Sequence, residues 1–212
     1  MQNYTPQTID DIVFESDAEK TKVINIVSGK INMPANGITG IILHGAPGTG
    51  KTALANILPH AIEQNKPNGA RPYVSRHSCM APNNGVQLIE SIDKQISLIA
   101  TSGSGLHYIV LDEADNLTSP ALRQLKSVMN THAAIFILTT NNIEAFDPAL
   151  RDRCEEISFN PSEPSIWLPK LRGVLHTAGK TGSYADDFLK SSIVERSRFS
   201  ARQILKQIQL LP

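Results

Sequence analysis

Short apolar runs alternate with segments of helical periodicity over much of the chain. The strand-like segments are residues 40–44, 71–75, 107–111 and 134–138. Helical spacing of apolar residues covers residues 18–28, 53–58, 86–100 and 120–130. Continuous apolar runs are typical of strands that are buried on both faces, and strands that alternate with helices predict a parallel sheet covered by helices. The predicted fold class is therefore α/β.

The helix over residues 86–100 has the clearest periodicity. Its predicted apolar face consists of Leu88, Ile89, Ile92, Ile96 and Ile99. The end of the helix that begins near residue 53 stays open, because Pro59 either ends that helix or kinks it.

The composition changes after residue 159. Three prolines mark a linker-like region: Pro161, Pro164 and Pro169. Three short helical segments follow, near residues 165–178, 185–196 and 200–210. We therefore predict a core domain over residues 1–160 and a small helical domain over residues 161–212, with Trp167 in the core of the second domain.

The composition limits the class of protein. Hydrophobic residues make up 41% of the 212, and 20 basic residues balance 20 acidic ones, so any contact with nucleic acid must come from a local patch. Cys79 and Cys154 form no CxxC pair, which favours a reducing compartment over a disulfide framework or a zinc site. The sequence has no signal-peptide pattern and no apolar run of roughly 18 residues. We expect a cytoplasmic protein.

Residues 45–52 match the pattern GxxxxGK[ST] between a strand-like and a helix-like segment, which is the context of a phosphate-binding P-loop. Glycines let the backbone curl around an anion, so that N–H groups and the helix N-terminus point at the phosphates. Lys51 is expected to reach the β- and γ-phosphates, and Thr52 to bind Mg²⁺. An ordinary glycine-rich turn is the alternative. The predicted nucleotide-binding residues are Gly45, Ala46, Pro47, Gly48, Thr49, Gly50, Lys51 and Thr52.

A second strand-like run ends in acidic residues. Residues 109–111 are followed by Asp112 and Glu113. We expect Asp112 to hold Mg²⁺ through water. Hydrolysis also needs a group that orients and deprotonates the attacking water, and Glu113 is the candidate for this base. The alternative is a solvated acidic loop.

From Asp112 onward, the resemblance to a known family becomes specific. Residues 112–118, DEADNLT, resemble the DEAD box of clamp-loader ATPases, the replication factor C type of AAA+ protein, and not the helicase DEAD box. Residues 125–130 fall where that family has a helix facing the central DNA channel. Residues 4–13, beginning at Tyr4, resemble the family's amino-terminal box, which packs around the adenine base. This resemblance implies that Ile12 and Val13 contact the base.

Two catalytic roles also come from the resemblance. Asn141 lies in a segment similar to the sensor-one strand and matches the residue that polarises the attacking water; taken alone, it could equally be a turn former. Arg153 lies in a segment that resembles the SRC motif, here DRC, whose arginine projects into the ATP site of the neighbouring subunit. A guanidinium suits that role because it can contact phosphate oxygens bidentately. The alternative is a surface arginine paired with Asp152 or Glu155.

Arg202 matches the sensor-two arginine, which contacts nucleotide from the lid, although the Gly-Asp pair of that motif is absent. With Arg198 and Lys206, at spacings of four, it could instead form the solvated basic face of a helix. Five other basic residues could line a DNA channel or carry ordinary surface charge: Arg71, Arg76, Lys94, Arg123 and Lys126.

The resemblance covers almost the whole chain and implies a five-stranded parallel AAA+ sheet followed by a three-helix lid. It implies an ATPase that uses ATP and Mg²⁺, assembles with itself or related AAA+ subunits, and acts on a sliding clamp and primer-template DNA. Clamp-loader subunits usually continue into a carboxy-terminal collar domain, which we do not expect here because the sequence ends at Pro212. Two other functions stay open: a small AAA+ loader or remodeller of a helicase or transposase, and a nucleotide-binding assembly subunit with little turnover.

Overall fold

The computed structural model describes residues 5–69, 71–161, 163–180, 182 and 184–211. Five strands form one sheet in the order β2-β3-β4-β1-β5, and every neighbouring pair is parallel. The strands are β1 Gly40–Gly45, β2 Tyr73–Ser78, β3 His107–Asp112, β4 Ala134–Thr140 and β5 Cys154–Phe159. The predicted α/β class and the five-stranded parallel sheet are confirmed.

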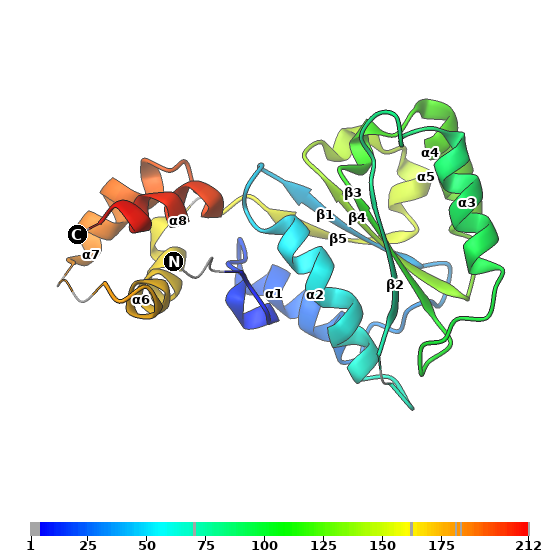
Figure 1. Cartoon of the computed structure of the whole chain (residues 1–212), viewed down its shortest axis with the longest axis horizontal. Coiled ribbons are helices and arrows are strands. Elements are labelled where there is room, and N and C mark those ends of the chain that lie inside the picture. The colour runs from blue at the N-terminus through cyan, green and yellow to red at the C-terminus, as the bar shows by residue number, and fades with distance from the viewer. Residues whose placement is uncertain (1–4, 70, 162, 181, 183, 212) are drawn as a thin grey trace.

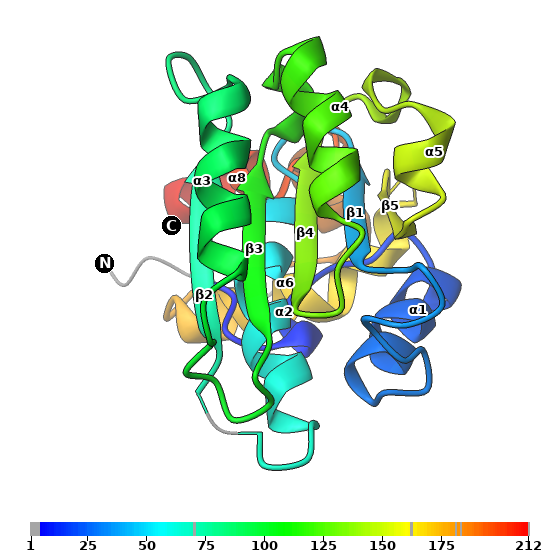
Figure 2. The ribbon, with the colours of Figure 1, turned by 90° about the vertical axis from the view of Figure 1, so that its right-hand side faces the viewer.

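Helices cover both faces of the sheet (Figure 1 and Figure 2). One face is covered by α3 (Val86–Ile96) and α4 (Ser119–Val128), and the other by α1 (Asp17–Val27) and α2 (Lys51–Gln64). Successive strand residues point to opposite faces, so Ile42 belongs to the first core cluster and Ile41 to the second. The shorter elements of this region are η1 Ile9–Asp11, η2 Ala114–Asn116, η3 Ile143–Ala145 and α5 Pro148–Arg151.

The chain after β5 forms a helical group of its own, which we call the lid helices and which lies to one side of the sheet (Figure 1). Its elements are η4 Pro164–Trp167, α6 Leu168–Thr177, α7 Asp186–Phe188, η5 Leu189–Glu195 and α8 Ala201–Leu210. A third core cluster joins them, and Trp167, which is 3% exposed, is part of it as predicted. No helix in the described part of the chain is long and apolar enough to cross a bilayer.

The ends of two helices were open or misjudged in the sequence-based expectation. Pro59 neither ends α2 nor stops its apolar face, because the helix continues to Gln64. The helix predicted to reach residue 100 ends at Ile96, where Leu98 N–H bonds to Gln95 O in a tighter turn. Ile99 therefore lies outside the apolar face and is 95% exposed, so its assignment to that face was wrong.

The strand predicted over residues 71–75 also shifts. β2 begins at Tyr73 and pairs with β3 residue by residue, from Tyr73 opposite His107 to Ser78 opposite Asp112. Pro72 has no N–H to give to the ladder, which explains why the strand starts after it. The extra length carries β2 to the sheet edge where Asp112 lies.

Candidate nucleotide-binding site

The P-loop connects β1 to α2 at the carboxyl edge of the sheet. Gly45, Gly48 and Gly50 have φ angles of 129°, 76° and 114°, which favour glycine strongly. A Cβ on Gly45 would also lie 2.6 Å from the Phe159 carbonyl oxygen. Glycine is therefore required there both for the backbone conformation and for the close approach of β5.

Lys51, the first residue of α2, lies against the loop. Its Nζ donates hydrogen bonds to the carbonyl oxygens of Gly45, at 2.9 Å, and Ala46, at 2.7 Å. Only 7% of the residue is exposed. Burial lowers the pKa of Lys51, although the nearby carboxylates, led by Asp115, favour the charged form. A buried ammonium on a flexible stem can turn from these carbonyls to an anion in the loop.

Thr52 and Asp112, the two predicted magnesium ligands, are in contact. Thr52 Oγ1 donates to Asp112 Oδ1 at 2.9 Å. The same carboxylate oxygen accepts a 2.6 Å hydrogen bond from Thr139 Oγ1. Hydroxyl and carboxylate oxygens suit Mg²⁺, which is usually held by one or two protein groups together with phosphates and water. The described residues contain no group of three or more His, Cys, Asp or Glu side chains that could hold a metal ion.

Thr139 was missed by the sequence reasoning. It is the next-to-last residue of β4, which is the neighbour of β3 in the sheet. Its hydroxyl also accepts a 2.9 Å hydrogen bond from the Glu113 N–H. A polar residue at the end of an apolar strand was the available signal.

Glu113 and Asn141 follow the ends of β3 and β4, at the same edge as the P-loop. Glu113 has φ 56°, a left-handed conformation that is unusual outside glycine and costs roughly 1 kcal/mol or more. Its hydrogen bond to Thr139 helps to hold it there. The Asn141 N–H points to Asp115 Oδ2 at 3.4 Å, and the residue is exposed. The sheet thus gathers Lys51, Asp112, Glu113 and Asn141 at one edge.

Arg153 lies at the opposite edge. It precedes Cys154, which pairs with Gly40 at the beginning of β1, whereas the P-loop begins at Gly45. Five residues of strand span roughly 16 Å. The guanidinium donates to Asn130 Oδ1 at 3.0 Å and to the Ala149 carbonyl oxygen. Among the described residues it forms no ion pair, so the surface pairing considered for it is not observed.

Arg202 lies at the P-loop, although it belongs to the lid helices. Its N–H donates to the Gly48 carbonyl oxygen at 3.3 Å, and a Cβ on Gly48 would collide with Ser200 Oγ. The amino end of α8 therefore rests on the loop, and the Arg202 side chain is exposed beside it. Arg198 has φ 49° and precedes α8, so it does not share a helix face with Arg202 and Lys206.

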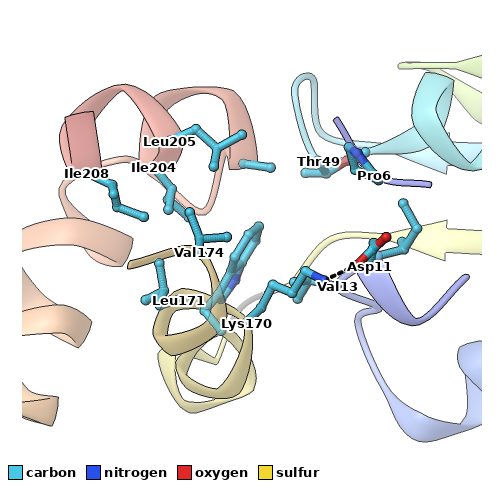
Figure 3. Close-up of a pocket in the computed structure, with 14 residues that line it drawn as sticks. Pro6, Asp11, Val13, Thr49, Lys170, Leu171, Val174, Ile204, Leu205 and Ile208 are labelled. Atoms are coloured by element: carbon cyan, nitrogen blue, oxygen red, sulfur yellow. Dashed lines mark hydrogen bonds and ion pairs between the residues drawn. The ribbon is translucent and has the colours of Figure 1, made fainter. Parts of the chain in front are cut away.

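A mostly apolar pocket lies between the amino-terminal segment, the P-loop and the lid helices (Figure 3). Residues on both sides line it, among them Ile12, Val13, Thr49, Leu171, Ile204 and Leu205. Ile12 and Val13, the residues predicted to contact the base, are thus in the wall of a pocket that adjoins the P-loop. Tyr4, where the resemblance to the amino-terminal box begins, lies outside the described residues.

An ion pair joins the two sides of this pocket. Lys170 Nζ of α6 lies 2.6 Å from Asp11 Oδ1 (Figure 3). Burial alone would raise the pKa of Asp11, but the hydrogen bond from Lys170 and two backbone N–H groups, of Gln7 and Thr8, outweigh it and hold that pKa below its usual value.

The five basic residues considered for a DNA channel have different surroundings. Lys126 forms an ion pair with Asp147 at 2.9 Å, and Arg76 Nε donates to Asn56 Oδ1 at 2.8 Å. Lys94 and Arg123 are exposed on α3 and α4. The arrangement singles out none of them as a nucleic-acid contact.

Residues 41–162 match the sequence model of the ATPase family associated with various cellular activities (AAA). Replication factor C small subunit 1 of Pyrobaculum arsenaticum is 28% identical over 214 residues, covering 99% of this chain and 60% of the relative. Replication factor C subunit 5 of Homo sapiens is 27% identical over 178 residues, covering 82% and 49%. The resemblance to the replication factor C type is confirmed, and the chain spans 60% or less of the length of these two relatives.

Among solved structures, the RuvB Holliday junction branch migration motor of Thermotoga maritima has a similar fold. The TM-score is 0.70 at 15% sequence identity, over 97% of this chain and 64% of that chain. A RuvB mutant from the same organism gives a TM-score of 0.72 at 16% identity, with 97% and 65% covered. At such identities the likeness concerns the fold alone.

Proposed function

Because the chain belongs to the AAA family of ATPases, we propose that it binds ATP with Mg²⁺ between the P-loop and the lid helices and hydrolyses it as an ATPase of the clamp-loader type. The observation that carries this proposal is the contact between Thr52 and Asp112. This contact brings Thr52 and Asp112 together next to Lys51, which supports a role for both residues as Mg²⁺ ligands. If residues 112 and 113 were only a solvated acidic loop, we would expect the Asp112 carboxylate to face water rather than to accept a hydrogen bond from the P-loop helix.

Binding of the phosphates is the task of the P-loop. Its N–H groups and the N-terminus of α2 face the anion, and Lys51 exchanges the Gly45 and Ala46 carbonyls for β- and γ-phosphate oxygens. Thr52 and Asp112 would hold Mg²⁺, which would supply positive charge to offset the negative charge of the phosphates. Arg202 contacts the phosphates from the lid side, and Ile12 and Val13 contact the base.

Hydrolysis requires an activated water. In this proposal Glu113 accepts its proton and Asn141 orients it, since both residues follow strands that end beside the P-loop. The hydrogen bond from Glu113 N–H to Thr139 fixes the backbone that carries the base. The Asp115 carboxylate accepts a hydrogen bond from the Asn141 N–H and so helps to hold the backbone of Asn141.

Arg153 acts in a neighbouring subunit. It starts roughly 16 Å of strand away from its own P-loop, farther than an arginine side chain extends. Asn130 and Ala149 hold the guanidinium in an orientation that does not depend on the chain's own nucleotide. An arginine that enters an ATP site in trans stabilises transition-state charge there. The functional unit is therefore an oligomer of this chain or of this chain with related AAA+ subunits.

The client is proposed from the relatives. Those reported above are replication factor C subunits, which favours a role on primer-template DNA with a sliding clamp. The two-part organisation, with the ATPase core over residues 1–160 and the lid over residues 161–212, lets nucleotide bound between the parts change their relative position.

Steady-state ATP hydrolysis tests the proposal. The protein with Mg²⁺ should hydrolyse ATP, primed DNA should change the rate, and Lys51→Ala should abolish turnover. A protein that binds ATP but does not turn it over, with or without DNA, would fit a structural role for the nucleotide and would contradict the ATPase proposal.

A further inference from the structure

Asn160 connects the end of the sheet to the P-loop. It follows β5 and precedes Pro161, where the chain leaves the sheet for the lid helices. Its Oδ1 accepts a 2.9 Å hydrogen bond from the Ala46 N–H. A Cβ on Gly45 would lie 2.8 Å from the same oxygen, so the glycine leaves room for this approach. A side chain at the junction with the lid thus holds the first peptide of the loop.

The next peptide group, which carries the Ala46 carbonyl, is held by the loop itself. The Ala46 carbonyl oxygen accepts hydrogen bonds from Thr49 Oγ1 at 2.8 Å and from Lys51 Nζ at 2.7 Å. If Lys51 turns to the phosphates, as the proposed function requires, its bonds to the loop carbonyls are lost. The bonds from Thr49 and to Asn160 do not involve the lysine. Asn160 can therefore keep the loop in place while the lysine binds the ligand.

Asn160 is in turn held by Glu15. Glu15 Oε2 accepts a 2.9 Å hydrogen bond from the Asn160 N–H and a short one from Ser158 Oγ. Asn160 Nδ2 donates to Ser158 Oγ at 3.2 Å, which closes the network. Glu15 lies two residues after Val13, which lines the apolar pocket proposed to hold the adenine base. We call this pocket the base pocket. One carboxylate thus ties the amino-terminal segment to the residue that holds the P-loop.

We propose that Asn160 is a positioning residue of the nucleotide site and that the series Glu15, Asn160, Ala46 couples the base pocket to the P-loop. The inference rests on the proposed function. When the adenine base of ATP packs against Ile12 and Val13, it also restricts the motion of Glu15. Glu15 in turn holds Asn160, and Asn160 holds the first peptide group of the loop. The adenine base then increases the affinity of the loop for phosphates through preorganisation rather than through new contacts.

Equilibrium binding tests this coupling, with Mg²⁺-ATP and inorganic tripolyphosphate each measured by displacement of a fluorescent ATP analogue. Loss of one neutral hydrogen bond changes an equilibrium about three- to tenfold. Asn160→Ala should weaken both ligands by that factor. Glu15→Ala should weaken ATP more than tripolyphosphate, which has no base. Glu15→Gln, which keeps an acceptor oxygen, should restore most of the ATP affinity.

Asn83→Ala is the matched control, because Asn83 is exposed on the loop before α3 and should leave both affinities unchanged. If the unaltered protein binds neither ligand, the proposed nucleotide site is wrong. If it binds both and Asn160→Ala stays within twofold of it, the positioning role is wrong. Should Asn160→Ala fail to fold, the Glu15 pair decides: equal losses of ATP and tripolyphosphate in Glu15→Ala, or no rescue by glutamine, contradict the coupling.

Discussion

At the scale of single residues, one carboxylate oxygen of Asp112 connects the P-loop helix with the neighbouring strand. Asp112 Oδ1 receives hydroxyl hydrogen bonds from Thr52 and Thr139. The first hydroxyl belongs to the P-loop helix and the second to the neighbouring strand. Because Thr139 also accepts the Glu113 N–H, it links the proposed magnesium ligand to the proposed base.

Thr139→Val should remove that link without changing the shape of the side chain. Thr139 is buried, so the unpaired Glu113 N–H and the lost bond to Asp112 should lower the free energy of unfolding by about 1–3 kcal/mol. Turnover should fall more than ATP affinity. Thr140→Val is the control, since the hydrogen bonds of the Thr140 hydroxyl within the described part of the chain go to the Asn142 backbone and not to Asp112 or Glu113. Equal turnover in the two variants would remove Thr139 from the site.

Glu113→Gln should separate binding from hydrolysis. The amide keeps the size of the side chain but accepts no proton, so ATP affinity should stay near that of the unaltered protein. Single-turnover hydrolysis should slow about 10²- to 10⁴-fold. A normal rate of hydrolysis in this variant would exclude Glu113 as the base.

Sequence reasoning reached the residues that belong to a local pattern. Lys51, Thr52 and Asp112 are readable because a P-loop and an acidic strand end have fixed spacings, and the structure brings them together. Thr139 and Asn160 belong to no such pattern. Their roles depend on which strands are neighbours, β4 beside β3 and β5 beside β1, and strand order is not written in the spacing of residues along the chain.

At the scale of elements, α8 and α6 each bring the lid helices into contact with the core. The amino end of α8 rests on Gly48, and α6 is tied to the amino-terminal segment by the ion pair of Lys170 with Asp11. The helical segments of the lid were predictable from their periodicity. These contacts were not, because both join residues far apart in the sequence.

Lys170→Gln should weaken the attachment of α6. The pair is partly exposed, so we expect a loss of about 1 kcal/mol in the free energy of unfolding at neutral pH. The pKa of Asp11 is lower in the folded protein than its usual 3.8. Its contribution is therefore complete above pH 4 and is lost as the pH falls toward the folded pKa.

The measurement is chemical denaturation of both proteins at a series of pH values. The difference between them should be constant from pH 7 to about pH 4 and should shrink below that. Lys206→Gln, a change at an exposed position of α8, is the control. A difference that grows on acidification would contradict the proposed ion pair.

At the scale of the whole molecule, the sheet separates two functions. The carboxyl edge of the sheet carries the P-loop, Asp112, Glu113 and Asn141, and the amino edge carries Arg153. A single chain therefore presents most of the proposed ATP site at one edge and the residue proposed to complete a neighbour's site at the other. This polarity follows from the parallel strands, because β1 and β5 run from Arg153 and Cys154 toward the P-loop.

Mixing two inactive variants tests this account most directly. Lys51→Ala disables the loop of its own site, and Arg153→Ala disables the site of its neighbour. Each alone should lose steady-state hydrolysis, by about 10³-fold or more for the arginine. Mixed, they should regain part of it, since the loop of one variant meets the arginine of the other. Lys51→Ala mixed with Glu113→Gln should regain none, because both defects lie in the same half of the site. No recovery at any ratio of Lys51→Ala to Arg153→Ala, in assemblies that contain both, would contradict a site shared between subunits.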